Sequence, residues 1–282
     1  MKSLDEPRVS VIIPAFNIEQ HIGETLDSLE CQTFRSFEAL VVDDCSTDRT
    51  ASIVRARAAL DPRIRYIRLE SNSNRPAVPR NRGLAEAKGE FVAFLDHDDL
   101  WFRRKLERQI RVLDSRPDLA LVHSYLWEFT ENSRFRGLVH LPNPLRRRAS
   151  YETLRKHNVV LCSSAVARLQ VLTDLGGFDE RSELRTVEDY QLWLRLGKNH
   201  KLGYLSEVQG YYRWSQTSTS RQENWLEKHT YLDEHEGTVF LANRPSRMWQ
   251  VSRKIAGYPL ALYFHLVEAK VRQILGKLPR VW

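Results

Sequence analysis

The sequence predicts an α/β fold with a mostly parallel central sheet flanked by helices. Two observations support this prediction: short apolar runs recur about every 27 residues in the first hundred, and segments of helical periodicity lie between them. Strand and helix that alternate at this spacing form right-handed β-α-β units with parallel strands. The apolar runs are residues 9–13, 37–42, 64–69 and 91–95.

Three helices are predicted between these strands because apolar residues recur on one face of each. Ser46 and Thr47 are the expected N-terminal caps of the second helix. The third helix follows a proline-rich start. The apolar positions are Ile22, Leu26 and Leu29 in the first helix, Ile53 and Leu60 in the second, and Leu84 and Ala87 in the third.

Beyond residue 100 the pattern continues with longer elements. Residues 101–115 are amphipathic and rich in arginine, which is typical of a helix, and the polar residues 131–150 indicate a surface loop. We expect a further helix over residues 187–196 and helical, aromatic structure from Ser215 onward. Strands are expected at residues 119–129, 158–166 and 202–214.

Polar and acidic residues follow three of the first four strands, and in parallel sheets the carboxyl ends of strands form the ligand-binding edge. Two carboxylates 4 Å apart repel by roughly 4 kcal/mol at an effective dielectric near 20, so a crowded group needs solvent, donors or a cation. A divalent metal is one interpretation; helix capping near Trp101 is the other. The residues are Pro14, Ala15 and Asn17; Asp43 and Asp44; and Asp96, Asp98 and Asp99.

No glycine-rich dinucleotide or P-loop motif follows any predicted strand, so neither of those phosphate sites is expected. Four motifs in the first hundred residues, and two farther on, resemble the signatures of family 2 glycosyltransferases, which have an inverting GT-A fold. The resemblance covers about residues 1–215 and leaves the tail outside it. The motif segments are residues 9–17, 41–48, 80–84, 89–99, 175–180 and 187–194.

The resemblance implies a site for a nucleoside diphosphate sugar. Asp98 would coordinate Mg²⁺ or Mn²⁺, with Asp96 near the ribose and the metal, and hard oxygen ligands suit either ion. Asp44 is expected to accept a hydrogen bond from N3–H of uracil or thymine, with Asp43 buried behind it; helix capping is the alternative for both. The expected floor under the nucleotide is Pro14, Ala15 and Asn17.

Arginines are expected at the donor phosphates. By resemblance Arg80 contacts the phosphates or the base, although Arg75 and Arg82 are close enough in sequence to replace it. Many family members carry a histidine in the segment that closes over the phosphates. Residues 211–220 contain none, so Arg213 is the expected cation there.

The resemblance makes Asp189 the general base that removes the proton from the acceptor hydroxyl. Glu188 is the alternative base, and both residues also have a purely structural interpretation as favourable charges at a helix N-terminus. Trp193, one helical turn along, either belongs to the core or stacks on the acceptor sugar.

The basic charge lies in the tail. The chain has 43 Lys and Arg against 36 Asp and Glu, and residues 244–282, with eight basic residues and one acid, account for the whole net charge of +7. Such a segment predicts an anionic partner, either a membrane surface or nucleic acid. Residues 258–267 suit an interfacial helix or a helix packed on the catalytic domain. No N-terminal signal pattern and three widely spaced cysteines predict a cytoplasmic protein, peripheral on the membrane face if the tail binds lipid.

Together these observations predict a catalytic domain over residues 1–215, with a nucleotide-sugar half (1–100) and an acceptor half (101–215), and a basic helical extension over 216–282. The predicted activity is metal-dependent transfer from a nucleoside diphosphate sugar, UDP-sugar before dTDP-sugar, to a glycan or lipid-linked acceptor. A sugar-phosphate nucleotidyltransferase is the alternative enzyme. A nucleic-acid-binding protein acting through its tail is the alternative without catalysis.

Overall fold

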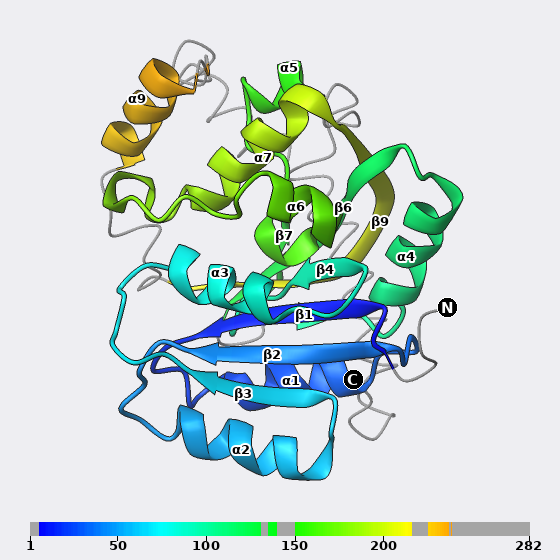
Figure 1. The fold of residues 1–282 in the computed structure, drawn as a ribbon, viewed down its shortest axis with the longest axis vertical. Coiled ribbons are helices and arrows are strands. Elements are labelled where there is room, and N and C mark those ends of the chain that lie inside the picture. The colour runs from blue at the N-terminus through cyan, green and yellow to red at the C-terminus, as the bar shows by residue number, and fades with distance from the viewer. Residues whose placement is uncertain (1–5, 131–134, 140–149, 216–224, 237, 239–282) are drawn as a thin grey trace.

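The four strands predicted in the first hundred residues lie side by side and parallel in the computed structural model (Figure 1). Their spatial order is β3-β2-β1-β4, which agrees with the predicted α/β fold. The structure describes residues 6–130, 135–139, 150–215, 225–236 and 238. The strands are β1 (Val9–Ala15), β2 (Phe37–Asp43), β3 (Ile64–Arg68) and β4 (Phe91–Phe94).

The sheet continues beyond β4 in the order β8-β6-β9-β5, and β7 pairs with β6. Strand β8 is antiparallel to both β4 and β6, whereas β6 and β9 are parallel. The strands predicted at 119–129 and 202–214 are confirmed as β6 and β9. The bounds are β5 (Leu100–Trp101), β6 (Leu119–Thr130), β7 (Phe135–Leu138), β8 (Val166–Arg168) and β9 (Lys201–Trp214).

Helices cover both faces of the parallel strands, and in β1, β2 and β4 the residues of either orientation are buried. On one face Ile12 packs in a core with Phe94 and Trp193, which confirms Trp193 as a core residue. On the other, Val11 and Ile13 pack with α1, α2 and α4. The helices are α1 (Ile22–Glu30), α2 (Thr50–Leu60), α3 (Ala77–Glu86), α4 (Lys105–Ser115), α5 (Tyr151–Leu154), α6 (Leu169–Asp174), α7 (Glu188–Asn199) and α9 (Trp225–His235).

The strand predicted at 158–166 is wrong for most of its length. Residues Cys162–Ser164 form a 3-10 turn, and β8 begins only at Val166. The amide of Ser164 donates to the carbonyl of Leu161 at 2.9 Å, and its hydroxyl donates to the same oxygen at 2.7 Å. Local bonds of this kind compete with sheet pairing, which explains why an apolar segment turns here.

Two further segments after residue 100 differ from their predictions. The helix predicted over 101–115 begins at Lys105, because Leu100 and Trp101 pair with β9 instead. The loop predicted at 131–150 contains strand β7, and most of its other residues lie outside the described ranges.

The predicted caps of α2 have a different role. The helix begins at Thr50, whose amide donates to Asp48 Oδ1 at 2.9 Å. Ser46 Oγ accepts instead from the amide of Asn17 at 2.9 Å, and the amide of Thr47 donates to Asn17 Oδ1 at 2.8 Å. Ser46 and Thr47 therefore join the loop after β2 to the loop after β1.

Of the predicted extension over 216–282, the structure describes residues 225–236 and 238. Helix α9 packs near the segment that precedes α7: Arg181 donates to the Tyr231 hydroxyl at 2.6 Å, and Lys228 donates to the carbonyl of Ser182 at 3.1 Å. Figure 1 shows α9 at the opposite end of the molecule from α2. Residues 258–267 lie outside the described residues. Among the helices that are described, none is long and apolar enough to cross a membrane.

Replacing Gly83 on α3 with alanine is expected to destabilise the fold. A Cβ atom there would lie 2.5 Å from Cγ2 of Ile12, a fully buried side chain. Overpacking of this kind costs about 1–3 kcal/mol, measurable as a lower free energy of unfolding in urea. Gly23→Ala on α1 is the matched control, because nothing outside the local helix lies within 4 Å of its Cβ position. Equal stability of the two variants would contradict the expectation.

Candidate functional site

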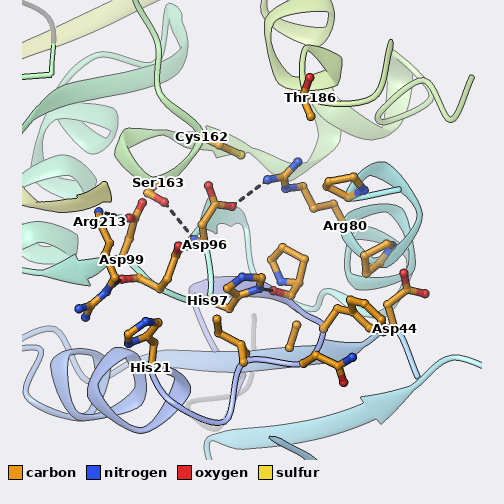
Figure 2. A pocket seen from close by; sticks show the side chains of 18 of the residues that line it. His21, Asp44, Arg80, Asp96, His97, Asp99, Cys162, Ser163, Thr186 and Arg213 are labelled. Carbon is orange, nitrogen blue, oxygen red and sulfur yellow. Dashed lines mark hydrogen bonds and ion pairs between the residues drawn. The ribbon is translucent and has the colours of Figure 1, made fainter. Parts of the chain in front are cut away.

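A cavity of about 710 Å³ opens at the carboxyl ends of β1, β2 and β4, the edge predicted from the sequence (Figure 2). Every predicted site residue except Asp43 lines it. Figure 2 shows His21 and Asp44 on one side of the cavity and Cys162 and Thr186 on the other. The lining residues fall within segments 14–21, 44–48, 74–80, 96–99, 158–163, 185–189 and 212–215.

Three carboxylates crowd the tip of β4. Asp99 is fully buried; its Oδ1 accepts from the amide of Arg213 at 2.8 Å, and its Oδ2 has no partner among the described residues. Burial raises the pKa of Asp99 well above its usual value, and the charges of Asp98 and Asp96 raise it further. Burial also raises the pKa of Asp98, against the opposing influence of His97. Carboxylates in such surroundings favour a bound cation.

The side chain of Arg213, on β9, lies against this acidic tip, and the phosphate contact expected for it stays a prediction. Its Nε donates to the carbonyl of Asp98 at 2.8 Å, and its second terminal nitrogen donates to Glu24 Oε2 at 2.6 Å. The guanidinium carbon lies 4.6 Å from the centre of the Phe129 ring, and Arg213 is buried. These contacts fix the positive charge of Arg213 in the wall of the cavity, beside the acidic tip.

Ser163 is a site residue that the sequence analysis missed. Its hydroxyl accepts from the amide of Asp96 at 3.0 Å (Figure 2). Its carbonyl accepts from Trp101 Nε1 at 2.9 Å. The 3-10 turn therefore supports the tip of β4. The sequence analysis missed Ser163 because it predicted a buried strand over residues 158–166. In such a strand the Ser163 hydroxyl would face the core or a neighbouring strand, not the tip of β4.

Pro14 and Ala15 at the end of β1, and Asn17 just beyond it, line one side of the cavity. The carbonyl of Pro14 lies 2.9 Å from His97 Nδ1, which ties the end of β1 to the loop after β4. Asn17 has φ +46°, a left-handed conformation that asparagine tolerates better than most residues. With Ala15 fully enclosed beside them, Pro14 and Asn17 lie where the sequence predicted a nucleotide floor.

The two aspartates after β2 differ in their surroundings. Asp44 lines the cavity, and its two oxygens accept from the amide and the hydroxyl of Ser73, each at 2.8 Å. Asp43 is fully buried, as expected, and binds the amide of Ser46 at 2.9 Å and Arg68 at 3.2 Å. Asp43 therefore holds the turn and strand β3 in place and does not reach the cavity.

Arg80 lies between the tip of β4 and the start of α7. Its terminal nitrogens donate to Asp96 Oδ1 at 2.8 Å and to Glu188 Oε1 (Figure 2 shows the bond to Asp96). Its guanidinium carbon lies 5.5 Å from the centre of the Phe178 ring. The two hydrogen-bond partners of the Arg80 terminal nitrogens are thus carboxylates of the chain itself. The phosphate or base contact expected for Arg80 stays a prediction.

Asp189 lies in the cavity wall at the start of α7, and its Oδ1 accepts from the amide of Tyr190 at 2.7 Å. Burial raises the pKa of Asp189 to about 7, and the neighbouring charge of Glu188 contributes to the rise while Arg80 opposes it. A carboxylate with this pKa is ionised in part at neutral pH and is a stronger base than an exposed aspartate.

The residues at the β4 tip fit a divalent metal ion. Asp96 and Asp98 offer hard carboxylate oxygens, and the orphaned Oδ2 of Asp99 lies in the same group. Within the described ranges, no three His, Cys, Asp or Glu side chains form a ready metal cage. Mg²⁺ is usually held by one or two carboxylates together with substrate phosphates and water, and Mn²⁺ accepts the same ligands. Asp96 and Asp98 would hold such an ion jointly with a diphosphate.

A mostly parallel sheet with an acidic loop after a central strand, and a ligand cavity above it, places the fold in the GT-A class of glycosyltransferases. The sequence profile of the family described as "Glycosyl transferase family 2" matches residues 10–176, more than half of the chain. The chain belongs to this family, and both the resemblance and the GT-A fold predicted from the sequence are confirmed.

Relatives with known names cover most of the chain. TuaG of Bacillus subtilis, a glycosyltransferase assigned to teichuronic acid biosynthesis, is 31% identical over 80% of this chain and 87% of its own length. WfgD of Escherichia coli, a UDP-Glc:alpha-D-GlcNAc-diphosphoundecaprenol beta-1,3-glucosyltransferase, is 31% identical over 77% of this chain and 81% of its own.

Solved structures of a fragment of TarS from Staphylococcus aureus also match this fold. The complex with UDP has a TM-score of 0.61 at 30% identity, over 74% of this chain and 61% of that chain. The complex with UDP-GlcNAc has a TM-score of 0.64 at 26% identity, over 77% of this chain and 61% of that one. This chain thus spans less than two thirds of the TarS fragment.

Asp189→Asn is expected to stabilise the folded protein at alkaline pH but not at acidic pH. The raised pKa means that wild-type stability falls as pH rises from about 4, where an unfolded aspartate ionises, to about 7, where the folded one does. The difference of about 3 between the folded and unfolded pKa values corresponds to about 4 kcal/mol, so the melting temperature of the variant should exceed that of the wild type by roughly 8–16 °C at pH 8 and approach it near pH 4.5. Calorimetry checks this, and an equal difference at both pH values would contradict it.

Proposed function

We propose that this chain transfers a sugar from a nucleoside diphosphate sugar to an acceptor hydroxyl, with inversion at the anomeric carbon. The observation that supports it most directly is Asp189, a carboxylate of pKa about 7 in the wall of the same cavity as the acidic tip of β4. Asp189 suits removal of a proton from an acceptor hydroxyl, and the acidic tip of β4 suits binding of a cation together with a diphosphate. Membership of a glycosyltransferase family agrees with both.

In the proposed reaction Asp189 takes the proton of the acceptor hydroxyl while the oxygen of that hydroxyl attacks the anomeric carbon of the donor sugar. The bond from that carbon to the diphosphate breaks, and its electron pair leaves with the diphosphate. A single displacement of this kind inverts the configuration. Arg213, held at the β4 tip, offers fixed positive charge to the departing group. A divalent ion bound by Asp98 and Asp96 would neutralise further charge on the diphosphate.

A UDP-sugar is the proposed donor, with dTDP-sugar next. Asp44 lines the cavity, and each of its oxygens keeps a lone pair beyond the bond to Ser73, so it can accept from N3–H of uracil or thymine. Cytosine lacks that donor. The names and titles of WfgD and the TarS complexes mention UDP-Glc, UDP and UDP-GlcNAc.

The proposed acceptor is a growing surface glycan or a lipid-linked intermediate. Its support is the names of TuaG and WfgD, which refer to teichuronic acid and to a diphosphoundecaprenol acceptor. The basic segment 244–282 would bring the protein to the anionic cytoplasmic face of a membrane.

Asp189→Asn is expected to lower the turnover number by about 10²–10⁴-fold, because the amide cannot accept the acceptor proton. Binding of UDP, measured by calorimetry, should stay within about twofold of wild type, since the substitution keeps the shape of the side chain. Release of UDP from a UDP-sugar measures the turnover. Full activity in this variant would remove Asp189 from the reaction.

Calorimetric titration of UDP, GDP, dTDP and CDP with and without Mn²⁺ tests the donor site. We expect UDP or dTDP to bind most tightly and Mn²⁺ to tighten that binding, because the ion would share the β4 carboxylates with the diphosphate. In Asp98→Ala the tightening should disappear. UDP binding that is the same with and without Mg²⁺ or Mn²⁺ in the wild type would argue against the metal site.

A further inference from the structure

A buried ion-pair bridge joins the strand tip on the donor side to the helix that carries Asp189. Arg80, on α3, binds Asp96 at the end of β4 and Glu188 at the start of α7, and Glu188 lies 108 positions away in the sequence. The side chains of Arg80 and Glu188 are 6% and 5% exposed, whereas that of Asp96 is 29% exposed. The bridge is therefore enclosed at α7 and open to the cavity at β4.

The hydrogen bonding of this buried bridge is incomplete, which limits what it can contribute to the stability of the fold. Arg80 Nε and Glu188 Oε2 are buried and have no hydrogen-bond partner among the described residues. A buried ion pair repays its desolvation only when the remaining donors and acceptors are satisfied, and apolar residues often stabilise a fold as well. Stability alone therefore does not account for this incompletely paired bridge.

The start of α7 is also strained. Thr186, a β-branched residue that lines the cavity, has φ +73°, a conformation that such residues rarely adopt. The N-cap residue Val187 makes no side-chain capping bond. Strained backbone persists only where its surroundings hold it, and the bond from Arg80 to Glu188 lies two residues from Thr186.

A favourable charge at a helix N-terminus is the simpler explanation of Glu188, but it accounts for little of this geometry. A carboxylate in that role needs only the exposed amides of the first turn. Glu188 is instead buried and directed to an arginine from another helix. Its contact joins the start of α7 to α3 and, through Arg80, to the tip of β4.

We propose that Glu188 is a positioning residue: through Arg80 and Asp96 it sets where Asp189 stands relative to the leaving group of the donor. The inference rests on the proposed function, because it assigns Glu188 a task in that reaction. A displacement of about 1 Å in such a group lowers the rate by as much as 10²-fold.

The charges around Asp189 make the proposal measurable. Glu188 on α7 and Asp96 at the β4 tip are the nearby carboxylates, and Arg80 on α3 is the nearby cation. Cys162 faces it from the 3-10 turn, and Arg185 lies on the segment before α7. Removing the charge of Glu188 lowers the pKa of Asp189, so the acidic limb of the rate profile moves to lower pH.

Two substitutions at Glu188 separate the possibilities. Glu188→Gln keeps the length of the side chain and loses its charge, whereas Glu188→Asp keeps the charge and loses reach. For each full-length variant, UDP release from UDP-glucose and UDP-GlcNAc is measured across pH, together with UDP binding and melting temperature. Glu183→Gln, an exposed acid in the preceding 3-10 turn Ser182–Leu184, is the matched control.

We expect both Glu188 variants to lower kcat by about 10–100-fold, with the donor KM and UDP binding within about twofold of wild type. Only Glu188→Gln should shift the acidic limb to lower pH, and Glu183→Gln should match the wild type. A wild-type rate in Glu188→Asp would favour the helix-terminus explanation and overturn the proposal. Loss of UDP binding in parallel with kcat, without a pH shift, would show a purely structural residue and overturn it too.

The experiment also separates this proposal from the proposed function. If the wild type releases UDP and Glu188→Gln releases it at the same rate, the positioning role alone is overturned. No UDP release by the wild type from either donor would overturn the proposed transfer from these donors and the role with it.

Discussion

Electrostatic repulsion among carboxylates at one edge of the sheet is the constraint on which the rest of the site depends. The acids that follow β4 at the carboxyl edge of the parallel strands lie in one cavity with the acids at the start of α7. Water would normally screen such charges, but much of this edge is buried. Buried carboxylates without donors or cations either take up protons or destabilise the fold. The arginines, hydroxyls and turns around the cavity are arranged to meet this constraint.

Two buried arginines divide the task between them. Arg213, from the last strand, binds the backbone of Asp98 and the carboxylate of Glu24, so it lies against the acidic tip from one side. Arg80, from α3, binds Asp96 and Glu188 from the other. Both arginines are buried, so water screens their charges little. The fold thus supplies positive charge from two distant segments, and a bound cation would supply more.

The parts of this site that are local in sequence were predictable, and those that depend on long-range packing were not. An apolar strand followed by Asp96, Asp98 and Asp99 is visible in eleven residues, and so is the alternation that places those strands in parallel. The support from Ser163 was missed, because nothing local shows that residues 158–164 turn toward β4. Side-chain partners over a hundred residues away, such as those joined by Arg80 and Arg213, follow only from the packed fold.

The same repulsion that threatens the fold makes Asp189 useful. A general base works best when its pKa lies near the working pH, since a weaker base has little affinity for the proton and a stronger one is already protonated. An exposed aspartate is far too weak, whereas Asp189, enclosed and next to Glu188, reaches a pKa of about 7. Arg80 limits that rise, since it is the opposing charge nearby. Base strength at this position is therefore a balance between one buried arginine and its carboxylate neighbours, and it depends on how firmly the bridge from β4 to α7 is held.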